Sequence, residues 1–257
     1  MTMDTLIVSL IVLACIFICA LLGFFARNAL PDHHLKDDTL LSVSLTTGLA
    51  ATISSLVLGL MISATYASFN RMCDEVAMTA ATTIILDRTL AEYGSETGSS
   101  RQLLIESHLS SIHFLYQARD RIEKGIEGPV RRTHLEKLLV KLRQLDPKDD
   151  NHRAIKAYAV EQAQRLLETR WLLVEHRSST IPQPFFIALV AWLSFIFFGF
   201  GLLTANNSTV LISLFGGALI AASAIFVIIE LENPLGGIIS VPSAPMETAL
   251  TLLGQPI

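Results

Sequence analysis

The hydrophobic and polar positions of the chain separate into four long apolar blocks and one long polar segment. Apolar residues dominate about 5–25, 40–67, 185–203 and 210–231, whereas charged residues are spread through 68–184. Each apolar block, at 1.5 Å per helical residue, is long enough to cross a hydrocarbon core of about 30 Å. The pattern therefore predicts four transmembrane helices with one aqueous insert between the second and the third.

The insert has the periodicity of amphipathic helices and no strand pattern. No breaker separates it from the second block, which predicts one continuous helix over Leu40–Tyr93. The Gly- and Ser-rich residues 94–100 predict a turn. Further helices are expected at about 100–124, 130–144 and 151–176, so the predicted fold class is all-α.

These elements predict four parts of the chain. Residues 1–67 form an N-terminal transmembrane pair, and residues 68–184 form a helical domain. Residues 185–231 form a C-terminal transmembrane hairpin. In the remaining part, 232–257, an interfacial turn and tail are expected, with helix resuming at about Met246.

The basic residues predict the orientation. Of 19 Lys and Arg residues, two lie in 26–39, seventeen lie in 67–184 and none follows Phe185. Basic residues near the membrane ends favour the cytoplasmic side, so the insert and both termini are expected in the cytoplasm and the spans in the inner membrane. The N-terminal block is too long for a signal peptide and lacks a basic leader, which predicts an uncleaved span.

Composition and motifs exclude several function classes. With 51% hydrophobic residues and a net charge of −4, the chain fits a lipid bilayer rather than nucleic acid as its partner. The insert has 17 basic and 16 acidic residues, as on an ordinary helical surface. The seven histidines and three cysteines have no metal-ligand spacing, and no nucleophile or phosphate-loop motif occurs. No enzyme activity, metal or cofactor is expected.

The second block has small and weakly polar residues on one helix face, at spacings of three, four or seven. These residues are Ser44, Gly48, Ser55, Gly59, Ser63 and Tyr66. Such a stripe is typical of close helix–helix packing in lipid, because small residues let backbones approach. It is also compatible with the wall of a water-filled path, and the pattern alone leaves both interpretations open.

A charged cluster follows where this helix is expected to leave the lipid. Arg71 has the spacing for side-chain pairs with Asp74 and Glu75. The cluster is either a solvated turn with weak ion pairs or, if several copies assemble, a charged ring at a channel mouth.

The fourth block ends in an acidic turn. Its residues are Glu230, Glu232, Asn233, Pro234 and Gly236. An ionisable side chain at the end of an apolar span is costly unless it reaches water or a partner, which makes Glu230 a functional candidate. The alternative is a helix stop followed by an interfacial loop.

This turn resembles the Asn-Pro-Phe-Gly turn after the last span of bestrophins. The layout of two spans, a helical insert and two spans is similar to the bestrophin-like family of largely uncharacterised bacterial membrane proteins. The resemblance implies an oligomeric anion channel, a pentamer in bestrophins, in which span two lines the pore and continues into a cytoplasmic vestibule.

Two departures limit this expectation. No acidic run follows Gly236, so the calcium-binding clasp of animal bestrophins has no counterpart. Span two also lacks their phenylalanines, and its bulky candidates for a constriction are Leu56, Leu58, Leu60 and Ile62. The sequence therefore supports two hypotheses, which are an oligomeric ion channel and a non-conducting membrane-anchored scaffold or stress sensor that binds a protein partner.

Overall fold

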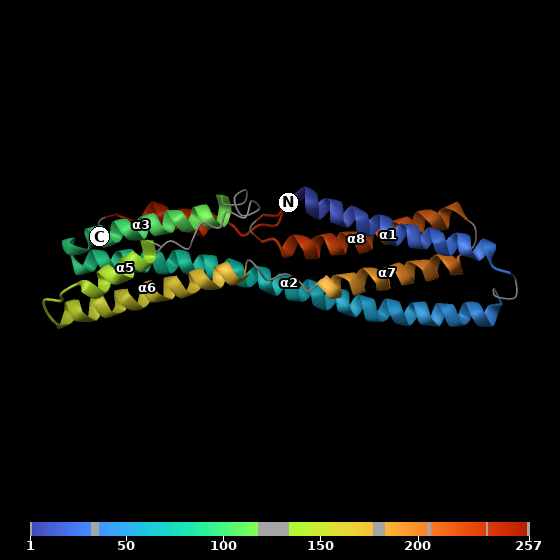
Figure 1. Cartoon of the computed structure of the whole chain (residues 1–257), viewed down its shortest axis with the longest axis horizontal. Helices are drawn as coiled ribbons and strands as arrows, with labels where there is room; N and C mark the ends of the chain where they lie inside the picture. Colours follow the sequence, from blue (N-terminus) through green and yellow to red (C-terminus); the bar gives the residue numbers. More distant parts are fainter. Residues whose placement is uncertain are drawn as a thin grey trace. The chain divides into compact units, whose positions relative to one another are not determined.

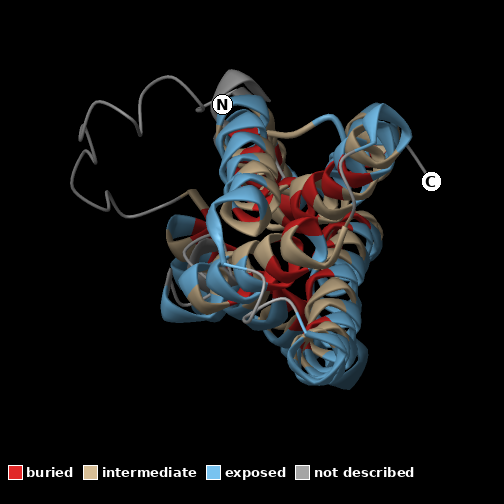
Figure 2. Ribbon diagram, turned by 90° about the vertical axis from the view of Figure 1, so that its right-hand side faces the viewer, coloured by how far each residue is buried: buried red, intermediate tan, exposed pale blue. Residues whose placement is uncertain are grey.

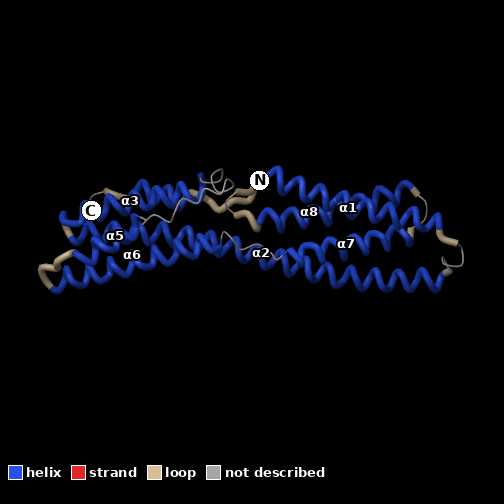
Figure 3. The backbone as a smooth tube through the Cα atoms, viewed as in Figure 1, coloured by secondary structure: helices blue, strands red, loops and turns tan. Residues whose placement is uncertain are grey.

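The structure is a computed structural model that describes residues 2–31, 36–117, 134–176, 183–204, 207–234 and 236–255. Every regular element within these ranges is helical (Figures 1 and 3), which confirms the all-α prediction. The predicted helix ends at Lys124 and Val130 lie outside the described residues.

Four helices are long and apolar enough to cross a membrane, as the sequence predicted. They are α1 (Thr2–Ala29), α2 (Asp37–Tyr93), α7 (Gln183–Leu203) and α8 (Ser208–Leu231). The 57 residues of α2 form one uninterrupted helix, which confirms the predicted continuation of span two to Tyr93.

The chain divides into two compact units. The first unit comprises Met1–Ser68 and Thr180–Ile239, and the second comprises Phe69–Ser179 and Ser240–Ile257. Helix α2 therefore contributes residues 37–68 to the first unit and residues 69–93 to the second. The expected placement of the insert in the cytoplasm remains a prediction.

In the first unit, α1 packs against α7 and α8 (Figure 1). The close approach of α1 and α7 depends on two glycines. A Cβ at Gly23 would overlap the Phe198 carbonyl, and a Cβ at Gly201 would overlap the Ala20 carbonyl. Small residues thus allow the backbones to meet, as in other membrane helix pairs.

The second unit contains the remaining helices. They are a 3₁₀ turn at Ser95–Thr97, α3 (Gly98–Ile112), a π-helix at His113–Gln117, α5 (His134–Gln144), α6 (Asp150–His176) and α9 (Ala244–Leu252). Leucines of α2, α3, α5 and α6 form its core, with Leu86, Leu104, Leu138 and Leu142 at most 1% exposed. Figure 2 colours the residues of the chain by burial, with the buried residues in red on the sides that helices turn toward one another.

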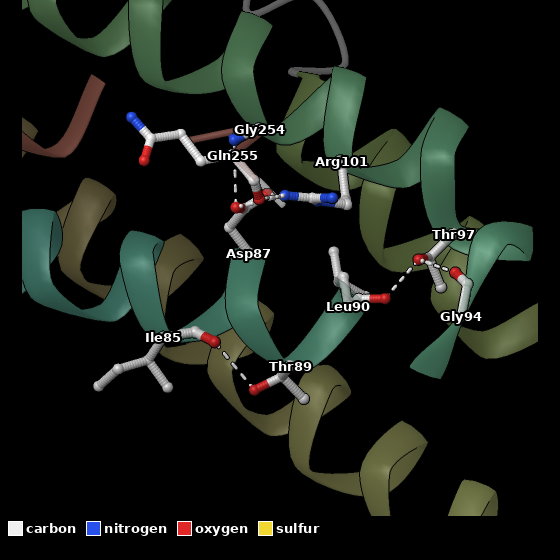
Figure 4. A network of polar contacts seen from close by, with 9 residues as sticks. All are labelled: Ile85, Asp87, Thr89, Leu90, Gly94, Thr97, Arg101, Gly254 and Gln255. Carbon is white, nitrogen blue, oxygen red and sulfur yellow. Dashed lines mark hydrogen bonds and ion pairs between the residues drawn. The ribbon is translucent and has the colours of Figure 1, made fainter. Parts of the chain in front are cut away.

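Helix α2 ends at a tight turn. Gly94 has φ of +122°, a region that residues with a Cβ rarely adopt. The fully buried Thr97 hydroxyl lies 2.5 Å from the Leu90 carbonyl and 2.7 Å from the Gly94 carbonyl (Figure 4). One side chain thus binds carbonyls at the end of α2 that lack helical partners.

The C-terminal segment is bound to the second unit by a buried ion pair (Figure 4). Arg101 on α3 donates two hydrogen bonds to Asp87 on α2, at 2.7 and 2.8 Å. It also donates to the Gln255 carbonyl at 3.0 Å, while the Gly254 amide donates to Asp87 at 3.2 Å. Residues 240–257 thus belong to this unit.

Candidate functional site

One side of span two faces the interior of the first unit. Thr47, Ser54 and Thr65 are 1%, 3% and 7% exposed, and their spacings of seven and eleven keep them on one face of α2. Gly199 of α7 lies against Thr47, because a Cβ added to this glycine would overlap the threonine side chain. This face provides the contacts of α2 within the unit.

The predicted stripe lies on a different face. All six of its residues, Ser44, Gly48, Ser55, Gly59, Ser63 and Tyr66, are exposed. Because Gly48 directly follows Thr47, it lies about 100° around the helix from the buried face. An added Cβ at Gly48 or Gly59 would meet no atom within 4 Å. Unlike Gly199, the glycines of the stripe therefore do not lie against another helix among the described residues.

A third face of α2 carries exposed leucines. Leu45, Leu49, Leu56 and Leu60 are 61–66% exposed. In the most apolar 18-residue window of α2, 11% of the residues are buried, against 28% to 33% for the other three apolar helices. Span two is thus the least covered of the four and leaves two faces, one small and one leucine-rich, for lipid, water or another copy of the chain.

The exposed stripe is longer than the sequence analysis found. Thr52 lies within it, and in the second unit Asn70, Asp74, Ala77 and Ala81 continue its spacing. From Ser44 to Ala81 the exposed positions recur at intervals of four, four and three residues, which is an 11-residue repeat of 3.67 residues per turn, close to the period of an α-helix. The spacing can be read from the sequence. A stripe defined by serine and glycine misses it, because some of its positions are alanine or asparagine.

The charged exit of span two is partly on this stripe. Asp74 is exposed and in register with it, whereas Arg71 is exposed on a neighbouring face and Glu75 is partly buried. Arg71 and Glu75 each take part in a polar interaction. Asp74 is thus the member of the cluster that continues the residue spacing of the stripe.

Of the bulky residues considered for a constriction, Leu58 packs against the core of the first unit. Leu56 and Leu60 are 65% and 61% exposed, and Ile62 is partly buried. Leu58 therefore packs inside the unit and does not face a path outside it. Leu56 and Leu60 lie on the outside of the unit and are the remaining candidates for a constriction.

The turn after α8 folds back over a carboxylate. Glu230 is 1% exposed, and one of its oxygens, Oε1, accepts a hydrogen bond from the Ile238 amide. The amides of Gly236 and Gly237 both donate to the Asn233 carbonyl at 3.1 Å, which closes the turn that contains Pro234. Glu232 takes part in a polar interaction and is partly buried.

The second oxygen of Glu230, Oε2, is buried and has no hydrogen-bond partner among the described residues. The sequence analysis expected this side chain to need water or a partner, and the structure supplies one backbone amide. The tight turn explains the motif locally, because Pro234 ends α8 and glycine at 236 and 237 lets the chain return to the carboxylate. Among the described residues, no three His, Cys, Asp or Glu side chains form a metal-ligand group.

Comparison with known proteins identifies the family. A family model described as the bestrophin-like domain matches residues 14–246. A comparison with curated protein sequences finds no match.

Solved structures of a bacterial bestrophin homologue from Klebsiella pneumoniae have a similar fold. One single-substitution variant is 16% identical, with a TM-score of 0.69 over 97% of this chain and 96% of that chain. Another is 16% identical, with a TM-score of 0.68 over 95% and 97%. A structure of the homologue solved by zinc phasing is 15% identical, with a TM-score of 0.67 over 95% and 96%.

The resemblance inferred from the turn at 230–236 and from the order of spans and insert is therefore confirmed over nearly the whole chain. The chain also has four helices that are long and apolar enough to cross a membrane. The chain belongs to the bestrophin-like family.

Proposed function

We propose that this protein is an oligomeric ion channel in which the small-residue stripe of α2 lines the conducting path. The observation that carries the proposal is the exposure of all six stripe residues, with open space around Gly48 and Gly59. Hydroxyl groups and exposed backbone at glycine favour contact with water, whereas the leucines on the neighbouring face favour contact with lipid or with an adjacent helix.

A path along α2 requires several copies of the chain. One helix has no lumen, so the stripes of several α2 helices must face a common axis. Family membership supports a homo-oligomer, and the resemblance to bestrophins suggests a pentamer. Leu56 and Leu60 lie beside the stripe and are the residues that would narrow the path and gate it by dewetting.

The positive-inside rule supports an inner-membrane protein with both termini and the insert in the cytoplasm. Anions are the conducted ions by resemblance to bestrophins. Asp74, in register with the stripe at the proposed cytoplasmic mouth, is a fixed negative charge that would act against anion entry. The ratio of anion to cation permeability therefore depends on this residue.

The test separates conduction from assembly. Ser55→Leu and Gly59→Leu fill the stripe at two exposed positions, and nothing lies within 4 Å of a Cβ added at Gly59. In liposomes that contain the purified protein, both variants should lose ion flux while the oligomer keeps its mass. Loss of the oligomer in both variants would instead assign the stripe to helix packing.

Ala64→Leu is the matched control. Ala64 is exposed on α2, and it lies about 140° around the helix from Gly59. The added volume is similar, so flux should persist in this variant. A wild-type protein that passes no ion at any voltage or pH would favour the non-conducting scaffold.

A further inference from the structure

The second unit contains a cavity of about 40 Å³ that its helices form together. Residues of α2, α3, the π-helix, α5, α6 and α9 line it, and most of them are leucines, threonines and serines. A cavity needs about 10–15 Å³ to hold one water molecule, so this one has room for roughly three waters or one small ion.

Arg170 of α6 is the cationic side chain of this cavity. It is partly buried and has no hydrogen bond or ion pair with the described residues. Burial lowers the pKa of Arg170, and the negative charge of Glu136 on α5 raises it by less. The guanidinium keeps its charge, because an arginine pKa is far above neutral pH. Its positive charge is therefore incompletely compensated inside the unit, which is costly unless something binds it.

Ser107 of α3 is a second donor in the same cavity. The residue is 5% exposed and lines the cavity together with Arg170. Ser107 and Arg170 thus place two side chains with hydrogen-bond donors in the lining of one small cavity.

The neighbouring imidazole adds no second charge. Nε2 of His108 lies 2.8 Å from the Met246 carbonyl of α9, and because a carbonyl only accepts, this nitrogen carries the hydrogen. Burial lowers the pKa of His108, so the ring is neutral at neutral pH. Among the described residues that line the cavity, Arg170 is therefore the charged one, and the carboxylate of Glu136 on α5 offsets part of its positive charge.

We propose that this cavity is a binding site for a small monovalent inorganic anion of about the size of chloride, held by the Arg170 guanidinium and the Ser107 hydroxyl. The anion would stabilise the contact of α3, α6 and α9. The site lies in the helical unit and is independent of the path along α2, so binding can be measured whether or not the protein conducts.

The test measures thermal unfolding of the full-length protein in detergent at constant ionic strength. Sodium chloride or bromide replaces sodium gluconate, whose anion is too large for the cavity. A ligand that binds only the folded state raises the melting temperature in a saturable way. The expected result is a saturable rise with chloride and bromide and no rise with gluconate.

Two substitutions and two matched controls locate the effect. Arg170→Gln and Ser107→Ala should raise the half-saturating chloride concentration, by about tenfold or more for Arg170→Gln, because hydrogen bonds to a charged partner are the strong ones. Arg165→Gln and Ser110→Ala alter exposed residues of the same two helices and should leave it unchanged. Equal chloride responses in all four variants, or no response in the wild type, would overturn the site.

Crystals grown in bromide give a second readout that does not depend on the stability of a variant. The anomalous difference map of the wild-type protein should show a peak beside the Arg170 guanidinium. A cavity that contains only water, with bromide peaks elsewhere or nowhere, would also overturn the proposal.

Discussion

Gly237 lies directly against the carboxylate of Glu230, so that a Cβ at this glycine would overlap Oε1 and Cδ of the glutamate. The next amide along the chain, that of Ile238, donates to the same Oε1. The contact and the hydrogen bond together hold the turn after α8 against the Glu230 carboxylate. Substitutions in the turn should therefore change the stability of the protein.

Gly237→Ala should destabilise the protein, because the methyl group forces the backbone or the buried carboxylate to move. Overpacking of this kind costs about 1–3 kcal/mol. Thermal unfolding of the purified protein measures the loss. Gly216→Ala on α8 is the control, since no atom lies within 4 Å of a Cβ there. Equal melting temperatures of the two variants would contradict the close contact between Gly237 and the Glu230 carboxylate.

Arg101→Met should be strongly destabilising, because it leaves the carboxylate of Asp87, which is 1% exposed, without its charged partner. Removing one member of a buried ion pair typically costs about 3–5 kcal/mol. The melting temperature should fall well below that of the wild type.

Arg165→Met is the comparison for this prediction. Its partner Glu161 and Arg165 itself are 54% and 62% exposed, and exposed pairs contribute about 0–1 kcal/mol. The double variant Asp87→Leu with Arg101→Met should recover part of the loss, since no charge is then left buried. Equal effects of Arg101→Met and Arg165→Met would contradict a buried pair that binds the C-terminal segment.

The pH dependence of stability should include a contribution from His108. Burial lowers its pKa, and the hydrogen bond to the Met246 carbonyl raises it by a smaller amount. The unfolded chain, with a histidine pKa near 6.5, binds more protons than the folded chain between the two pKa values. The contribution is therefore fully present above about pH 6.5 and is lost as the pH falls through the folded pKa.

His108→Gln keeps a donor for the Met246 carbonyl and removes the titrating group. Its melting temperature should depend less on pH below 6.5 than that of the wild type, when both are scanned from pH 8 to pH 5. Parallel curves for the two proteins would assign the acid sensitivity to other groups.

Asp74→Asn should raise the permeability of anions relative to cations, because it removes a negative charge from the proposed mouth of the path. The shift of reversal potential in a salt gradient across a planar bilayer measures this ratio. Asp38→Asn removes a charge from the first turn of the same helix and serves as a comparison for general charge effects. An unchanged ratio in Asp74→Asn would place Asp74 outside the path.

The sequence predicted the helices well because each long element has a strong physical signal. The apolar blocks matched α1, α7 and α8, and the absence of a breaker before Tyr93 correctly predicted one helix through span two. Stripe residues such as Gly59 were readable from spacing, but whether they face another helix or open space depends on packing, which periodicity does not encode.

The contacts of the C-terminal segment were not predictable in the same way. Asp87 and Arg101 are 14 residues apart, and their link to Gly254 and Gln255 joins segments more than 150 residues apart. The cavity with Ser107 and Arg170 likewise exists only where several helices meet. From the sequence alone, an isolated arginine on α6 would be assigned to the solvent-exposed surface of the helix.

The most direct measurement of the central claim uses a single cysteine at position 59. The native Cys15, Cys19 and Cys73 are first replaced by serine, and Gly59→Cys or Ala64→Cys is then introduced. A charged, membrane-impermeant thiol reagent is added to the protein in liposomes while ion flux is recorded. If the stripe of α2 lines the path, the reagent stops flux in Gly59→Cys and leaves flux in Ala64→Cys unchanged. Undiminished flux in Gly59→Cys, with modification verified by mass, would contradict the account.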